Sequence, residues 1–250
     1  MKVLAIGNSF SVDSMEYLFY ILKDLGQTDI FLGNLFVGGC SVDLHVQNAE
    51  KGAYAYEYFT NENGEWAVNP EYKSVSAICS QNWDYVTMQQ ASGYSGQVKS
   101  YGNLQKLKEF AREHSKNSKF VWNMTWAYQS DSQHPHFEYY GKSQEAMYNA
   151  IVNAVQTVIL PDKDFEFIIP VGTAIQNART AFGDILTRDG FHLSIPLGRY
   201  IAALTWAKML TKKSLKSLEY APCGINEKTK QIAIAAVEGA VKKPFAVTKV

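Results

Sequence analysis

The chain has 250 residues, enough for one large α/β domain with a sizeable core or for two small domains. Its 24 Lys and Arg residues balance its 24 Asp and Glu residues, so the formal net charge is zero. That balance argues against a nucleic acid or a membrane surface as partner, because strongly basic patches bind both. We expect a single domain over residues 1–250 with neither kind of partner.

The cysteines and the apolar stretches exclude further classes of protein. Cys40, Cys79 and Cys223 are far apart and match neither a zinc-ligand spacing nor a disulfide framework. No uncharged apolar stretch has the length of a transmembrane helix. The first residues lack a signal-peptide pattern, so a cytoplasmic location is expected if the chain is complete. The composition does not predict an oligomeric state.

The first clear pattern is an apolar run at 3–6 that ends at once in turn residues. Such a run predicts a strand buried on both faces, and the apolar spacing at 15–22 predicts a helix after it. Ser9 therefore lies where a strand passes into a helix, a place where α/β sheets carry ligand chemistry and helices expose free N–H groups. Its hydroxyl can act as a nucleophile there. The alternative is that Ser9 or Ser11 only caps the helix.

Strand-like and helical patterns alternate along the rest of the chain. Further apolar runs predict strands at 30–37, 83–89, 120–126 and 165–171. Helical patterns lie at 44–58, 104–114, 140–160, 174–181, 196–210 and 228–241. Two connecting segments remain, a surface hairpin or loop at 61–73 and a short helix or connector at 75–80. The alternation predicts a three-layer α/β/α sandwich with a mainly parallel five-stranded sheet, flavodoxin-like in strand order by analogy.

Polar residues follow several of the predicted strands. Ser9 follows the first strand, Gly39 the second and Gln90 the third, while Asp189 and His192 lie in the loop before the long helix at 196–210. Because parallel strands end at one edge of a sheet, we expect these residues to lie together. They include a candidate for each role that a serine nucleophile needs: base, orienting carboxylate and oxyanion donor. Taken singly, each could equally be a turn, cap or loop residue.

Several of these segments resemble a known family. The sequence G-N-S-F-S at 7–11 resembles the first block of the SGNH/GDSL hydrolases, with Asn8 where Asp is usual. Gly39 fits their second block, and D-G-F-H at 189–192 fits their D-x-x-H block. The third block, G-x-N-D, is absent, and Q-Q-A-S at 89–92 stands in its place. The chain is thus similar to a less studied bacterial branch of that superfamily.

The resemblance implies an SGNH-type serine esterase that works through an acyl-enzyme. Ser9 would be the nucleophile, His192 the base and Asp189 the residue that orients the base. One turn of chain between Asp189 and His192 lets the carboxylate reach Nδ1, leaving Nε2 for Ser9. Small acyl esters, acetyl groups on carbohydrate foremost, are the substrates that the analogy favours.

The predicted oxyanion hole combines the backbone N–H groups of Ser9 and Gly39 with a side-chain amide. Gln90 is our prediction for that amide, because Asn and Gln both carry an NH₂ donor. Gln89 precedes it directly, and neighbouring side chains on an extended strand point to opposite sides. The sequence therefore predicts that only one of the two glutamines faces the cleft.

The remaining aromatic and histidine residues give weaker expectations. Trp126 and Tyr128 follow the fourth predicted strand and are expected to line the substrate cleft, with core packing as the alternative. His45 and His114 lie on helical patterns and are expected at the surface or its boundary.

Other chemistries are less well supported by the sequence. His134, His136 and Asp131 share a polar loop, but H-x-H spacing without a third placed ligand does not predict a metal site. No cofactor is expected. A non-catalytic flavodoxin-like module holding phosphate or flavin at 7–11 is an alternative that leaves the predicted base and its carboxylate without a role. An acyltransferase would use the same three catalytic residues.

Overall fold

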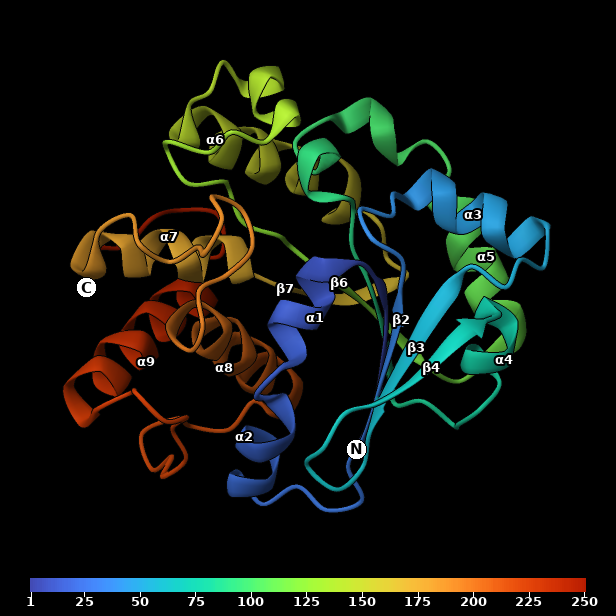
Figure 1. Cartoon of the computed structure of the whole chain (residues 1–250), viewed down its shortest axis with the longest axis horizontal. Helices are drawn as coiled ribbons and strands as arrows, with labels where there is room; N and C mark the ends of the chain where they lie inside the picture. The colour runs from blue at the N-terminus through green and yellow to red at the C-terminus, as the bar shows by residue number, and fades with distance from the viewer.

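The computed structural model describes all of residues 1–250 and is built on a seven-stranded sheet (Figure 1). The strands are β1 (Lys2–Gly7), β2 (Phe31–Phe36), β3 (Tyr56–Asn61), β4 (Ala67–Tyr72), β5 (Tyr85–Met88), β6 (Lys119–Asn123) and β7 (Phe165–Ile169). The α-helices are α1 (Ser9–Met15), α2 (Leu18–Asp24), α3 (Val42–Glu50), α4 (Ser74–Ile78), α5 (Leu104–His114), α6 (Gln144–Ala154), α7 (Val171–Phe182), α8 (Leu197–Thr211) and α9 (Glu227–Lys242). Short 3-10 segments are η1 (Ser92–Tyr94), η2 (Val98–Tyr101) and η3 (Pro135–Tyr140), and η4 (Val155–Ile159) is a π-helical extension of α6.

The sheet has the order β4-β3-β2-β1-β5-β6-β7. Its five parallel strands, β2-β1-β5-β6-β7, follow the flavodoxin-like order. The prediction of five strands is wrong, because β3 and β4 add an antiparallel pair beside β2. The helix expected at 44–58 ends at Glu50, and the surface hairpin or loop expected at 61–73 contains the turn and the second strand, β4, of an antiparallel hairpin with β3.

Helices cover both faces of the sheet. In Figure 1, α1, α2, α7, α8 and α9 lie on one side, and α3, α4 and α5 lie on the other. Starting from the central strand β1, the chain adds β2 on one side of it, and then adds β5, β6 and β7 in turn on its other side. The topological switch point therefore lies between β1 and β5, which is where sheets of this order bind ligands.

The core confirms the prediction that β1 is buried on both faces, since Val3, Leu4, Ala5 and Ile6 are all at most 2% exposed. They belong to a cluster of 66 buried apolar residues drawn from every part of the chain. None of the helices has the length and apolar character needed to span a bilayer.

His45 differs from its prediction as a surface or boundary residue. It is 1% exposed on α3, and its Nδ1 lies 3.0 Å from the hydroxyl of Tyr56 in β3. Burial lowers the pKa of His45 to about 4. The helical pattern could not predict this contact, because Tyr56 lies in β3, where a helix was expected.

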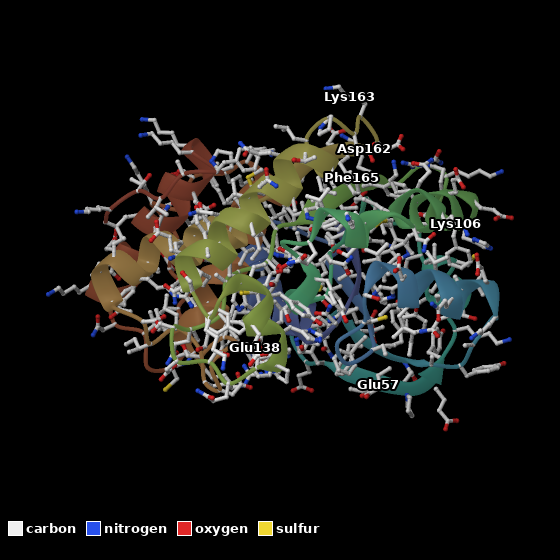
Figure 2. The ribbon with its side chains drawn as sticks, turned by 90° about the horizontal axis from the view of Figure 1, so that it is seen from above. Glu57, Lys106, Glu138, Asp162, Lys163 and Phe165 are labelled. Carbon is white, nitrogen blue, oxygen red and sulfur yellow. The ribbon has the colours of Figure 1, made fainter.

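An ion-pair cluster supports the β7 edge. Figure 2 labels Asp162, Lys163 and Phe165 together where the chain turns from η4 into β7. The Nζ of Lys108 on α5 lies 2.6 Å from Asp162 and 2.7 Å from Asp164. Burial by itself would lower the pKa of Lys108, but the hydrogen bonds with these carboxylates outweigh it and raise that pKa. The cluster ties α5 to the start of β7.

Candidate active site

The turn after β1 presents the Ser9 hydroxyl. A Cβ on Gly7 would lie 2.3 Å from Ser11 Oγ, so the tight turn needs glycine there. Asn8 is the N-cap of α1, and its Oδ1 accepts the Phe10 N–H at 3.0 Å. Because Asn8 supplies the cap, the alternative in which Ser9 caps the helix does not describe this turn.

Asp189, His192 and Ser9 lie together in one hydrogen-bonded series. His192 Nε2 is 2.8 Å from Ser9 Oγ, and His192 Nδ1 is 2.6 Å from Asp189 Oδ2. The other carboxylate oxygen, Oδ1, accepts the backbone N–H of His192 at 2.8 Å. Burial would raise the pKa of Asp189, but hydrogen bonds from the side chain and backbone of His192 outweigh it and hold that pKa below its usual value. The carboxylate is therefore ionised at neutral pH.

The loop that carries the histidine is a short hairpin. Thr187 and Leu193 form an antiparallel bridge, and Gly190 at the tip has a φ of 89°, a conformation that favours glycine. A Cβ at Gly190 would also approach Ser132 Cα to 3.0 Å. The D-G-F-H sequence thus fits a turn that returns His192 towards the sheet.

Asp13, which no sequence pattern had singled out, fixes this loop to α1, the helix that carries Ser9. Asp13 is completely buried on α1, and its Oδ2 accepts the N–H of Leu193 at 2.7 Å. Arg199 Nε donates to Asp13 Oδ1 at 2.8 Å, and Arg188 Nη1 lies 3.1 Å from the same oxygen. The sequence does contain one signal for it: Asp13 stands four residues after Ser9, so the two residues lie on the same face of the helix.

Two backbone N–H groups are free to bind an oxyanion. Among the hydrogen bonds of the chain, none is donated by the N–H of Ser9 or Gly39. Gly39 is exposed and has a φ of 62°. Its loop is held on one side by Asn8 Nδ2, which donates to the Cys40 carbonyl at 3.0 Å, and on the other by Gln90 Oε1, which accepts the Val42 N–H at 3.0 Å.

Gln90 does not have the surroundings expected of an oxyanion donor. It is 1% exposed, and its Nε2 donates to the carbonyl and hydroxyl of Ser100, at 2.8 and 3.1 Å. Gln89 is buried as well, with its Nε2 donating to Asn8 Oδ1 at 2.8 Å. The two side chains have different partners, as expected of neighbours that point to opposite sides of a strand. Both hold loops in place instead of facing the cleft.

Trp126 and Tyr128 stand behind the site rather than lining an open cleft, since both are 0% exposed. The Trp126 ring stacks on Phe10 at a centroid distance of 4.0 Å, and its Nε1 donates to the Phe191 carbonyl at 2.7 Å. The hydroxyl of Tyr128 lies 2.7 Å from Ser92 Oγ. These residues hold the neighbours of the nucleophile and the base.

Exposed and half-buried rings next to the base form what we call the aromatic wall: Phe191, His134, His136 and Tyr139. Phe191 lies 4.1 Å from the His192 ring and 4.8 Å from His134, measured between centroids. His134 is 5.2 Å from His136, which stacks on Tyr139 at 5.0 Å. Tyr139 is 53% exposed, so the wall runs from the base to open solvent.

The two wall histidines are engaged with rings and backbone. His134 Nδ1 accepts the N–H of His136 at 3.2 Å, and Asp131 Oδ1 accepts from Gln129 at 2.9 Å. Burial, and then the neighbouring His136 and His192, lower the pKa of His134, so its ring is neutral at neutral pH. No group of three or more His, Cys, Asp or Glu side chains is arranged to hold a metal ion.

Solved structures with this fold include hydrolases. A DUF4886 family protein from Bacteroides uniformis superposes with a TM-score of 0.96 at 41% identity, covering 100% of this chain and 98% of that chain. A Slackia heliotrinireducens protein, provisionally assigned as an SGNH hydrolase, gives 0.56 at 20% identity over 84% and 98%. Axe2, an acetylxylan esterase from Geobacillus stearothermophilus, gives 0.50 at 13% over 88% and 94%. The last two likenesses show a shared fold.

Sequence comparison gives the family. No relative was found among curated protein sequences. The family model described as a domain of unknown function, DUF4886, matches residues 2–240. The chain therefore belongs to the DUF4886 family, whose α/β fold is that of SGNH-type hydrolases.

Proposed function

We propose that this protein is a serine esterase that hydrolyses small acyl esters, foremost acetyl esters of carbohydrates, through an acyl-enzyme. One observation carries the proposal: the hydrogen-bonded series from Asp189 through His192 to Ser9, with 2.6 and 2.8 Å between its members. A nucleophile, a base in reach of it and a carboxylate that orients the base are the parts that acyl transfer needs.

In the first half of the reaction, Ser9 Oγ attacks the ester carbonyl carbon while His192 Nε2 takes the hydroxyl proton. Asp189 fixes the Nδ1–H tautomer of His192 and stabilises the imidazolium that forms. The carbonyl oxygen becomes an oxyanion, for which the N–H groups of Ser9 and Gly39 are the proposed donors. The C–O bond to the alcohol then breaks, His192 returns its proton to that oxygen, and the acyl group stays on Ser9.

In the second half, a water molecule attacks the acyl carbon and gives a proton to His192. The tetrahedral intermediate collapses, the bond to Ser9 Oγ breaks, and His192 returns the proton to that oxygen. The products are a carboxylic acid and the free enzyme, so the atoms balance without a further reactant. An acyltransferase would differ only in using an alcohol in place of this water.

Two features support a small acyl group on a large neutral alcohol. The triad is open, with the side chains of His192 and Asp189 20% and 39% exposed, which suits a short acyl group better than a long buried chain. The aromatic wall offers ring faces beside the base, and such faces pack against the C–H surfaces of sugar rings. The acetylxylan esterase of this fold adds a fold-level analogy only.

The phosphate- or flavin-binding alternative is not favoured. It assigns no role to Asp189 and His192, and a carboxylate near the proposed anion would repel it. A colourless preparation would agree with this view.

Hydrolysis of p-nitrophenyl acetate and of acetylated sugars tests the proposal. We expect acetate release by the wild-type protein, covalent labelling of Ser9 by a fluorophosphonate, and loss of both in Ser9→Ala with the unfolding midpoint retained. EDTA should leave the rate unchanged. Labelling at another serine, or full activity in Ser9→Ala, would contradict the proposal.

A further inference from the structure

Four buried side chains form one hydrogen-bonded chain along the carboxyl edge of the sheet. Trp206 Nε1 on α8 donates to Asn123 Oδ1 at 3.1 Å, and Asn123 Nδ2 donates to Gln89 Oε1 at 2.8 Å. Gln89 Nε2 donates to Asn8 Oδ1 at 2.8 Å, and Asn8 Nδ2 donates to the Cys40 carbonyl at 3.0 Å. All four side chains belong to residues at most 2% exposed. We call this series the amide relay.

The amide relay has only one satisfied direction. The indole of Trp206 can only donate, and the carbonyl of Cys40 can only accept. Each amide between them has one acceptor oxygen and one NH₂ donor. Turning any one amide around would set acceptor oxygen against acceptor oxygen on one side and donor N–H against donor N–H on the other. The two ends therefore determine how the side chain of Asn8 is oriented.

Asn8 is the member that reaches the candidate oxyanion hole. Its Oδ1 accepts the N–H of Phe10 at 3.0 Å, on the turn that carries Ser9. Its Nδ2 holds the carbonyl of Cys40, the residue that follows Gly39. One side chain thus contacts both loops whose N–H groups are the proposed oxyanion donors, so its orientation sets how far apart these donors lie.

We propose that Gln89, Asn123 and Trp206 are positioning residues, which fix the Asn8 amide and thereby the geometry of the oxyanion hole. The inference rests on the proposed function. It assigns to Gln89 an indirect role, in place of the direct donation that the sequence analysis expected of Gln90. A buried network in which every group is satisfied is rigid, and a missing member leaves its neighbours free to rotate.

The proposal predicts a loss of kcat with little change in KM, because the oxyanion forms only in the transition state. Removing one oxyanion donor outright lowers kcat by about a hundred- to a thousandfold, and misplacing a catalytic group by about 1 Å lowers it by up to about a hundredfold. We expect Gln89→Leu to lower kcat for p-nitrophenyl acetate by about a hundredfold and Trp206→Phe by about tenfold. KM should stay within about twofold.

The double variant separates a relay from independent structural damage. If Trp206 acts through Gln89, then Gln89→Leu with Trp206→Phe should have the kcat of Gln89→Leu alone. Thr205→Val is the matched control, since Thr205 is equally buried on α8 but its hydroxyl donates to Ile201, outside the relay. Its kcat should equal that of the wild type. Losses that multiply in the double variant, or a wild-type kcat in Trp206→Phe, would overturn the proposal.

A second measurement does not depend on activity. Hydrogen exchange of the Phe10 amide, followed by NMR, reports whether Asn8 still accepts that N–H. Exchange should be faster in both Gln89→Leu and Trp206→Phe and unchanged in Thr205→Val. If the wild-type protein hydrolyses no ester, the proposed function fails, but faster exchange in the two variants still supports the relay. Unchanged exchange overturns it. Should Gln89→Leu not fold, Trp206→Phe decides both measurements.

Discussion

At the scale of single residues, the position of His192 depends on an acid outside the proposed triad. Asp13 lies one helical turn after Ser9 and holds the N–H of Leu193, the residue next to His192. It is completely buried, with Arg188 and Arg199 as its cationic partners. The distance between Ser9 and His192 is therefore set through α1 itself.

Replacing Asp13 by asparagine keeps its shape and removes its charge. We expect Asp13→Asn to lower the free energy of unfolding by about 2 kcal/mol, because the half-buried Arg188 and Arg199 lose hydrogen bonds to a charged acceptor while Arg199 keeps its partner Glu16. We also expect kcat to fall by about tenfold, because the loop that carries His192 is held less firmly. Thermal unfolding and ester kinetics measure the two effects.

Glu16→Gln is the matched control for that experiment. Glu16 pairs with Arg199 at 2.8 Å, but it does not contact the loop of His192. Losing this ion pair should lower the free energy of unfolding by about 1 kcal/mol or less and leave kcat unchanged. Equal kcat values for the two variants would contradict the role given to Asp13.

From the sequence, Ser9, Asp189 and His192 are expected to lie together, as they do, but the partners of Gln90 are not foreseen, for a physical reason. Ser9, Asp189 and His192 stand in short segments whose residue types and spacing already indicate the proposed chemistry. Gln90 was expected in the cleft, but its amide binds Ser100, which lies in a loop segment without a periodic pattern. Tertiary packing determines which group a side-chain amide binds, and the side of the strand to which the amide points does not predict it.

At the scale of elements, α3 meets β3 through the buried pair His45 and Tyr56. A neutral histidine is required there, since burial lowers the pKa of His45 to about 4. In the unfolded chain the pKa is about 6.5. As pH falls below 6.5 the unfolded chain therefore binds a proton that the folded protein does not. The stability contribution is complete above about pH 6.5 and is lost as pH falls towards 4.

This difference gives a prediction with a definite sign. Between pH 7.5 and pH 5, the wild-type protein should lose about 2 kcal/mol of unfolding free energy through His45. His45→Gln, which cannot titrate, should lack that part of the pH dependence whatever its own stability. Denaturant unfolding at the two pH values measures it. Parallel losses in both proteins would show that His45 is not the titrating group.

The same pair of elements explains where the predicted fold went wrong. The five parallel strands are continuous apolar runs, which a sequence displays plainly. In β3 only Glu57 is exposed, and two half-buried residues, Phe59 and Thr60, follow one another, so no regular alternation marks the strand; in β4 five of six residues are exposed and one is Pro70. Pairing with β2 makes a strand of β3, and this pairing is a tertiary event that the local pattern does not record.

At the scale of the whole molecule, the aromatic wall joins two distant parts of the chain. The η3 segment supplies His136 and Tyr139, and the hairpin before α8 supplies Phe191 next to the base. No single segment could predict this surface, because the topology of the sheet brings the two parts together. In the proposed function, a glycan bound at Ser9 and His192 would extend towards its outer end, Tyr139.

Tyr139→Ala tests the wall as a binding surface. We expect KM for an acetylated oligosaccharide to rise by about tenfold, the effect of losing about 1.4 kcal/mol of ring contact, with kcat unchanged. For ethyl acetate, which is too small to reach Tyr139, neither constant should change. Tyr20→Ala, which removes an exposed tyrosine from α2, is the control and should behave as the wild type. A rise in KM for both esters would count against the wall.

The outer strand β4 has a consequence for self-association. An open sheet edge invites a strand from another molecule, which leads to aggregation. Here Pro70 offers no N–H, Glu71 has a φ of 55°, and the register with β3 shifts between Tyr56 and Tyr58. A second chain would meet an interrupted row of donors beside the exposed charge of Glu71. The hairpin that widens the sheet therefore also ends its growth, and concentrated protein is protected from edge-to-edge polymerisation on this side.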